Sequence, residues 1–132
     1  MQYAYQEGVW RGPLVVLVDG GTGSAAAQFA AELQDNHAAI VVGTHSGGAG
    51  CGYTDGGTPT ILTNSRAVLR LPDCVRLRAS GANAALGVEP DVPVALPADS
   101  PAAANAREVA ASLGEAVALA RHQHETLSSE RR

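Results

Sequence analysis

Apolar residues fall into short, dense runs in the first third of the chain. Leu14–Val18 is an unbroken run of leucine and valine, which is typical of a strand buried on both faces. Residues 24–36 predict a helix, because Phe29 and Leu33 stand four positions apart, as on the buried face of a helix. Ala25, Ala26 and Ala30 are expected to add a face of small residues. Ile40–Val42 is a second buried run. This order predicts a βαβ unit with parallel strands and a right-handed crossover.

The second half of the chain predicts shorter and more solvated strands. Apolar residues alternate there with arginines, so each strand is expected to keep one side in water. We expect three such strands, at residues 58–62, 67–71 and 75–78, separated by turn residues. Residues 87–94 are expected to be extended, because prolines interrupt them.

A long helix is expected near the end of the chain. Ser100 suits the N-cap and Pro101 the first helical position, and the pattern continues to about His124. The apolar residues that this helix is expected to bury are Val109, Leu113 and Val117. The chain then divides into an irregular lead-in, a core, a linker with the C-terminal helix, and a disordered tail, at residues 1–12, 13–95, 96–125 and 126–132.

Length and charge limit the class of protein. With 132 residues the chain makes one domain or part of one. The net charge of −4, the absence of lysine and the scattered arginines argue against nucleic-acid binding. The sequence contains no run of about 18 apolar residues, so no membrane span is predicted. The first residues are neither basic nor apolar, so no signal peptide is expected.

The chain has two cysteines, Cys51 and Cys74. Two are too few for a structural zinc site, and no histidine stands beside them at ligand spacing. Either they form one disulfide across a glycine-rich loop, which would imply an oxidising compartment, or they are free thiols. The sequence leaves both alternatives open. We expect no metal centre and no cofactor.

Ser24 is the main candidate for chemistry, because it follows a strand and a turn of glycines and begins a helix. A hydroxyl there faces the unpaired N–H groups and the positive dipole end of the helix. That position can hold a nucleophile and stabilise an oxyanion. Serine is also a good N-cap residue, so a purely structural role is the alternative.

A serine nucleophile needs a general base. The chain has no lysine, which excludes a Ser–Lys dyad within it. His45 follows the second strand and should lie at the same edge of the sheet as Ser24, where ligands bind in open α/β sheets. His45 is therefore the candidate internal base, with an ordinary loop histidine as the alternative. His37, His122 and His124 are expected at the surface or at the end of a helix.

The glycine turn also fits a nucleotide-binding pattern. Residues 21–26 match the Gly-x-Gly-x-x-Ala fingerprint that follows a strand in dinucleotide-binding domains. That fingerprint also requires an acidic residue at the end of the next strand, and residues 40–44 supply none. A nucleotide-binding βαβ domain is therefore a further alternative.

Three blocks in this order resemble the C-terminal processing and tricorn-like serine peptidases of family S41. The first is the strand, the glycine turn and the helix of residues 14–33. The second is residues 34–44 with the glycine-rich loop that follows, and the third is the Gly-Val-Glu-Pro-Asp sequence of residues 87–91. Together they span about residues 13–95, which indicates the C-terminal part of the catalytic domain.

The resemblance implies a fold and a reaction. The fold would be the family's crotonase-like α/β core, here a βαβ unit followed by a β-rich segment and a C-terminal helix. Ser24 would attack a peptide carbonyl to form an acyl-enzyme, with the Ala25 N–H as one oxyanion donor. Gly21 and Gly23 would let the substrate backbone approach closely. The resemblance also implies a secreted or periplasmic location, and in a secreted bacterial subgroup the two cysteine blocks would pair.

Departures from the family pattern lower the activity that we expect. The lysine-using branch places its base at about Ala49, and the tricorn-like branch has an acidic residue where residues 83–86 have none. Ala27 stands where the family often has glutamate. We therefore expect a serine peptidase that is weak or inactive as this isolated chain, with the base in another segment or subunit. A degenerate domain that binds peptides or apolar ligands without cleavage is the alternative.

Overall fold

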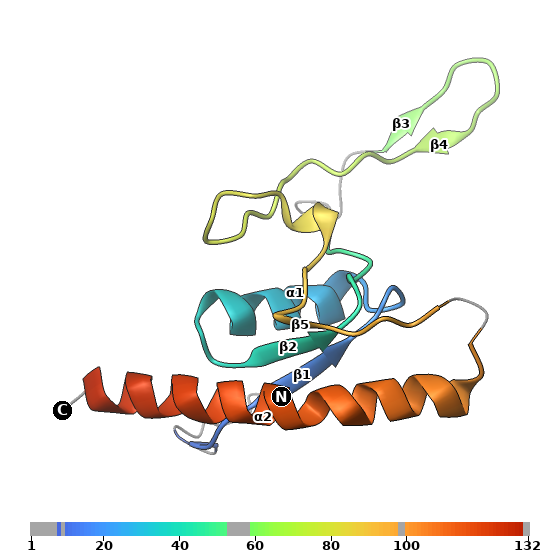
Figure 1. The fold of residues 1–132 in the computed structure, drawn as a ribbon. Coiled ribbons are helices and arrows are strands. Elements are labelled where there is room, and N and C mark those ends of the chain that lie inside the picture. The colour runs from blue at the N-terminus through green and yellow to red at the C-terminus, as the bar shows by residue number, and fades with distance from the viewer. Residues whose placement is uncertain (1–7, 9, 53–58, 98–99, 131–132) are drawn as a thin grey trace.

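The computed structural model describes residues 8, 10–52, 59–97 and 100–130. Outside these lie residues 1–7 and 9 of the predicted lead-in, residues 53–58 (the last of which begins a predicted strand), residues 98–99 and residues 131–132. The elements, in chain order, are β1 (Val15–Val18), α1 (Ser24–Asp35), β2 (Ile40–Gly43), β3 (Thr60–Ile61), β4 (Val68–Leu69), the short 3-10 helix η2 (Ala84–Leu86), β5 (Val92–Pro93) and α2 (Ala102–Glu130). Figure 1 shows their arrangement.

The core is a three-stranded sheet in the order β1-β2-β5. β1 and β2 are parallel, with Val15 opposite Ile40, which confirms the parallel strands predicted for the βαβ unit. β5 joins the other side of β2, also in parallel, through the pair Val42 and Val92. The sheet thus places the segments that follow β1, β2 and β5 at one common edge.

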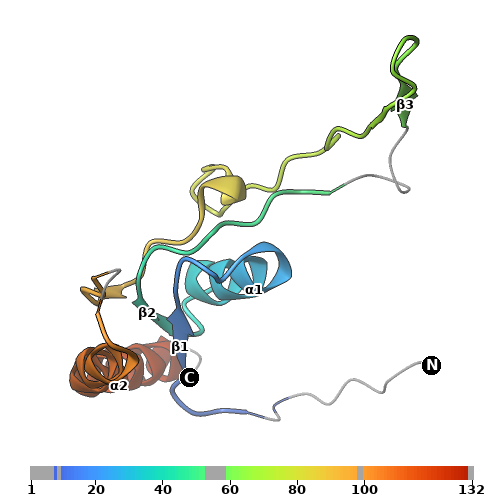
Figure 2. The same cartoon turned by 90° about the vertical axis from the view of Figure 1, so that its right-hand side faces the viewer.

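One helix covers each face of this sheet, as Figures 1 and 2 show. The α1 face is a cluster of small and β-branched side chains: Val18, Ala30, Ala31, Val41 and Val88. On the α2 face the buried cluster is Ile40, Val42, Val92, Val94, Ala116 and Ala120. Val41 and Val42 alternate between the two faces and are completely buried, because β2 is the central strand.

Alanine forms the buried faces of both helices, which confirms Ala30 of the predicted small-residue face and corrects the larger residues of the predicted core. Phe29 is 57% exposed, and the residues that α1 buries are Ala27, Ala30 and Ala31. In α2 the buried residues are Ala116 and Ala120, while Val117 is 37% exposed and Val109 only packs at the border. Small side chains allow the helix backbones to approach the sheet closely, so the helices turn their larger residues away.

β1 departs from the prediction of a strand buried on both faces. It is an edge strand, and Leu17 in its middle is 54% exposed. Val15 is packed at the border of the α2 cluster, and Val16 at that of the α1 cluster. Complete burial of a hydrophobic strand requires a neighbour on each side, and β1 has one on the β2 side only among the described strands.

Residues 59–73 form a long arm that projects away from the sheet and its helices (Figures 1 and 2). β3 and β4 lie within two of the predicted strands and form an antiparallel pair, but each is only two residues long and exposed on both sides, where one buried side was expected. The third predicted strand is reduced to a single bridge between Leu77 and Asn83. A disulfide joins Cys51 and Cys74, with their Cα atoms 5.5 Å apart, and closes the base of the arm.

α2 begins and ends later than predicted. The Pro101 carbonyl accepts the N–H groups of Ala104 and Asn105, so the helix starts at Ala102 rather than at Pro101, the predicted first helical residue. It continues to Glu130, so residues 126–130 are helical where a disordered tail was expected. No glycine or proline stops the helix after His124, and the Thr126 hydroxyl donates to the His122 carbonyl at 3.0 Å. Neither helix is long and apolar enough to cross a membrane, within the part of the chain that the structure covers.

An ion pair fastens the segment that follows the arm to the end of α1. Arg78 donates to both oxygens of Asp35 at 2.7–3.0 Å and to Gln34 Oε1 at 2.7 Å. The Ala79 N–H donates to the same carboxylate at 3.0 Å. These bonds, led by those from Arg78, hold the pKa of Asp35 below its ordinary value of 3.8.

Removing this ion pair is expected to make stability less sensitive to acid. Because folding lowers the pKa of Asp35, its contribution is complete above pH 3.8 and is lost as pH falls through the lower folded value. Arg78→Gln should reduce the free energy of unfolding by about 1–2 kcal/mol near neutral pH, and the difference from the wild type should shrink below pH 3.8.

Urea unfolding followed by circular dichroism at several pH values measures this difference. Arg76→Gln is the matched control, because it removes an arginine two residues away that is exposed. A difference between wild type and Arg78→Gln that stays constant down to the lowest pH would show that Asp35 does not carry the effect.

Candidate active site

The turn between β1 and α1 is closed by its own polar side chains. Asp19 Oδ1 accepts the Gly21 N–H and the Thr22 hydroxyl, each at 3.0 Å. The Thr22 N–H donates to the Asp19 carbonyl at 2.9 Å. Aspartate favours this geometry, because its carboxylate can bond the backbone two residues ahead. The turn therefore delivers the chain to Ser24 in a defined conformation.

Ser24 is the first residue of α1 and has a left-handed backbone conformation, with φ at +53°. The N-cap is Gly23, which corrects the alternative that Ser24 serves simply as the N-cap. Ser24 is exposed, and its hydroxyl has no hydrogen bond to any residue that the structure describes. A serine with positive φ is a strained position, and such positions gather at functional sites.

A loop after β2 holds the backbone of Ser24 in place. The Ser24 N–H donates to the Gly48 carbonyl at 2.8 Å, and the Gly47 N–H donates to the Thr22 carbonyl at 2.9 Å. Gly23 and Gly48 thereby form a parallel bridge that extends the β1–β2 ladder. The Ala25 N–H, by contrast, has no acceptor among the described residues. It lies at an exposed helix start, where it can donate to an incoming oxyanion.

The same loop is packed from the other side by the segment that precedes β5. The Ser46 hydroxyl accepts the Val88 N–H at 2.9 Å, and Ser46 is only 2% exposed. The Ala49 N–H donates to the Ala84 carbonyl at 2.9 Å. Gly48 needs its glycine, because φ is +83° and a Cβ would collide with the Ala85 carbonyl. The loop is therefore held between the Ser24 turn and residues 84–88.

His45 lies on this loop, but its contacts are with the segment before β5. Its Nε2 stands 3.7 Å from Glu89 Oε1, with side chains that are 48% and 82% exposed. A Cβ at Gly87 would lie 2.5 Å from the imidazole, so the ring packs on that glycine. Ser24 and His45 follow parallel neighbouring strands and so lie at the same end of the sheet, but no hydrogen bond joins them in the described structure.

Asp91 completes the scaffold under the site. One of its carboxylate oxygens accepts the Val41 N–H at 2.8 Å, and the other accepts Gln34 Nε2 at 2.9 Å. β5 begins only at Val92, so the carboxylate supplies an acceptor to β2 just before the β2–β5 ladder begins. The aspartate of the Gly-Val-Glu-Pro-Asp sequence thus ties β2 to the end of α1.

Sequence reasoning missed several of the residues that hold the site. Ser46, Asn83 and the positive-φ glycines Gly48 and Gly87 were not singled out. The dense glycines of residues 47–52 were a signal that the loop runs close to other backbone, but their partner segment is about forty residues away in sequence.

The comparisons with known proteins agree on one family. The model of peptidase family S41 matches residues 1–94. A carboxy-terminal-processing protease of Bartonella bacilliformis is 34% identical over 86 residues, which cover 64% of this chain and 19% of that protein. Among solved structures, mature CPAF in complex with lactacystin aligns with a TM-score of 0.58 at 25% identity, over 86% of this chain and 21% of that one.

A second structure of mature CPAF aligns over 62% of this chain and 15% of that one, with 30% identity and a TM-score of 0.49. The chain thus spans about a fifth of the length of the proteins that it matches. The family match covers both segments that build the site, from the glycine turn through residues 87–91. On this basis the chain belongs to peptidase family S41.

Proposed function

We propose that this chain is the nucleophile-bearing part of an S41 serine peptidase domain with a crotonase-like core, and that Ser24 is the nucleophile. The observation that carries the proposal is the conformation and exposure of Ser24. It follows the glycine turn with positive φ, is exposed, and has no hydrogen-bond partner for its hydroxyl among the described residues. Membership of the family makes a peptide or protein the substrate class.

In the proposed reaction, Ser24 Oγ attacks the carbonyl carbon of a peptide bond, and the hydroxyl proton passes to a general base. The carbonyl oxygen becomes an oxyanion, which the Ala25 N–H and the start of α1 would stabilise. Collapse of the intermediate breaks the C–N bond and leaves an acyl-enzyme, and the proton goes to the leaving amine. Gly21 and Gly23 leave room beside the nucleophile for the substrate backbone.

The general base is proposed to come from another segment or subunit. His45 is the internal candidate, but its imidazole contacts Gly87 and Glu89 rather than Ser24. Without its base, a serine peptidase site retains roughly 10³–10⁴-fold catalysis over water from the oxyanion hole and substrate binding. The isolated chain is therefore expected to react slowly at Ser24. The family match favours this function over a nucleotide-binding domain.

Labelling with a fluorophosphonate probe, followed by peptide mapping, tests this assignment. We expect the adduct on Ser24, in preference to the exposed residues Ser65 and Ser80, and no adduct in that peptide of Ser24→Ala. Ser80→Ala is the matched control and should label like the wild type. Adducts spread evenly over the exposed serines would mean that the chain is a degenerate domain without a nucleophile.

A further inference from the structure

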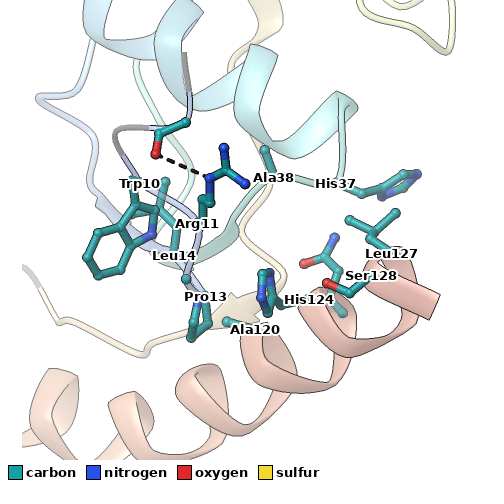
Figure 3. A pocket seen from close by; sticks show the side chains of 13 residues that line it. Trp10, Arg11, Pro13, Leu14, His37, Ala38, Ala120, His124, Leu127 and Ser128 are labelled. Atoms are coloured by element: carbon teal, nitrogen blue, oxygen red, sulfur yellow. Dashed lines mark hydrogen bonds between the residues drawn. The ribbon is translucent and has the colours of Figure 1, made fainter. Parts of the chain in front are cut away.

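A cavity in the described structure lies away from Ser24. It has a volume of about 600 Å³ and is formed by three segments: residues 8 and 10–14, the turn after α1, and the last third of α2. Figure 3 shows Trp10 and Arg11 from the first segment, His37 from the second and His124 from the third. Leu14 and Ala38 stand just before β1 and β2, whereas Ser24 follows β1. The cavity therefore lies at the N-terminal ends of β1 and β2, and Ser24 lies at the opposite, C-terminal ends of the strands.

The lining combines apolar surface with basic side chains. The apolar part comes from Trp10, Pro13, Leu14, Ala38, Ala120 and Leu127. Arg11, His37 and His124 supply basic groups, and no carboxylate side chain is among the described lining residues. This is unusual for a chain with 13 acidic and 9 basic residues. Two acids lie near the lining: Glu125 lines an adjacent smaller hollow that shares His124, and Asp35 interacts electrostatically with His37.

The polar groups of this cavity are available to a ligand. Arg11 uses only its Nε, which donates to the Gly8 carbonyl at 3.4 Å, so the terminal guanidinium nitrogens have no acceptor within the described chain. The imidazoles of His37 and His124 likewise make no hydrogen bond or ion pair there. Trp10 is 67% exposed at the rim of the cavity, although burying the large apolar surface of a tryptophan is strongly favourable.

We propose that this cavity binds a small amphipathic anion, namely a carboxylate attached to an aromatic or aliphatic group. The volume lies within the range of about 300–1,000 Å³ that small-molecule sites occupy. Arg11 would bind the carboxylate through its guanidinium, with His124 as a second donor. The aromatic or aliphatic part would pack on Trp10 and on the apolar floor at Ala120, which is 3% exposed. The site does not depend on the chemistry of Ser24.

Binding of phenylbutyrate and of its neutral amide to the 132-residue chain tests the proposal. Amide chemical shifts in NMR titrations report both the affinity and the place of binding. We expect the acid to change the amide chemical shifts of residues around Ala38 and Ala120. It should bind about threefold to tenfold more tightly than the amide, because the neutral amide cannot form charge-assisted hydrogen bonds with Arg11. Arg11→Gln should remove that preference, and Trp10→Ala should weaken both ligands.

Two variants provide controls. His122→Gln changes a histidine on the same helix that does not line the cavity, and Arg66→Gln removes an arginine on the distant arm. Both should bind the acid like the wild type, while His124→Gln should weaken it. Equal affinity for acid and amide, shifts outside the cavity, or unchanged binding in both Arg11→Gln and His124→Gln would overturn the proposal, as would the absence of any binding.

Discussion

Replacing Gly48 with alanine should lower the free energy of unfolding by about 2–4 kcal/mol. Gly48 has φ at +83°, which favours glycine, and an added Cβ would collide with the Ala85 carbonyl and come within 3.0 Å of the Gly87 nitrogen. Backbone cannot move aside as a flexible side chain can. The loop would therefore shift away from residues 84–88, and the Gly48 carbonyl would lose the Ser24 N–H, to which it is bonded at 2.8 Å.

The effect on Ser24 separates this prediction from simple destabilisation. Gly50→Ala is the matched control, because a Cβ at Gly50 meets nothing within 4 Å. Urea unfolding gives the change in stability, and hydrogen exchange of the Ser24 amide in the native state reports the bond to Gly48. We expect faster exchange in Gly48→Ala only. If both variants unfold and exchange alike, the loop does not hold Ser24.

Replacing Asp91 with alanine should destabilise the chain by about 2–3 kcal/mol. The carboxylate accepts the Val41 N–H at 2.8 Å, and Val41 is completely buried in the central strand. Alanine would leave that N–H without an acceptor, and an unsatisfied buried donor carries its full desolvation penalty. The bond from Gln34 to the same carboxylate would also be lost, although Gln34 would keep its bond to the Glu89 carbonyl at 3.0 Å.

Glu89→Ala is the control for Asp91, since it removes a carboxylate two residues earlier whose side chain is 82% exposed. Its effect should stay within a few tenths of a kcal/mol. Asp91→Asn should fall between the two variants, because an amide oxygen can still accept one of the two bonds. Thermal or urea unfolding measures all three. Equal stability of Asp91→Ala and Glu89→Ala would remove Asp91 from the scaffold.

The local patterns of the first third of the chain predicted its fold well. Valine-rich runs on both sides of a helix leave few alternatives to parallel strands, and the glycine turn marks the place where strand passes into helix. The packing was harder to predict. Periodicity identified Phe29 as core, but close approach of α1 to the sheet favours alanine there and leaves Phe29 exposed. Burial of Leu17 depends on neighbours that a strand's own sequence does not reveal.

The candidate site was predictable where it is local in sequence. Ser24 could be singled out from the turn that precedes it, whereas its bond to Gly48 depends on a loop 24 residues away. His45 was predicted at the correct edge of the sheet, but the direction of its side chain depends on Gly87 and Glu89. The pairing of Cys51 and Cys74 was left open, because the distance between two cysteines is a property of the fold.

The central claim is that folding makes Ser24 more reactive than an ordinary serine. The most direct test is the rate constant for fluorophosphonate modification of Ser24, measured in the folded chain and again in the chain unfolded in urea. If the exposed hydroxyl and the free Ala25 N–H act as proposed, modification is faster in the folded chain and falls to the rate of Ser80 on unfolding. Equal rates in the two states would contradict the claim and leave Ser24 as an ordinary residue at the start of a helix.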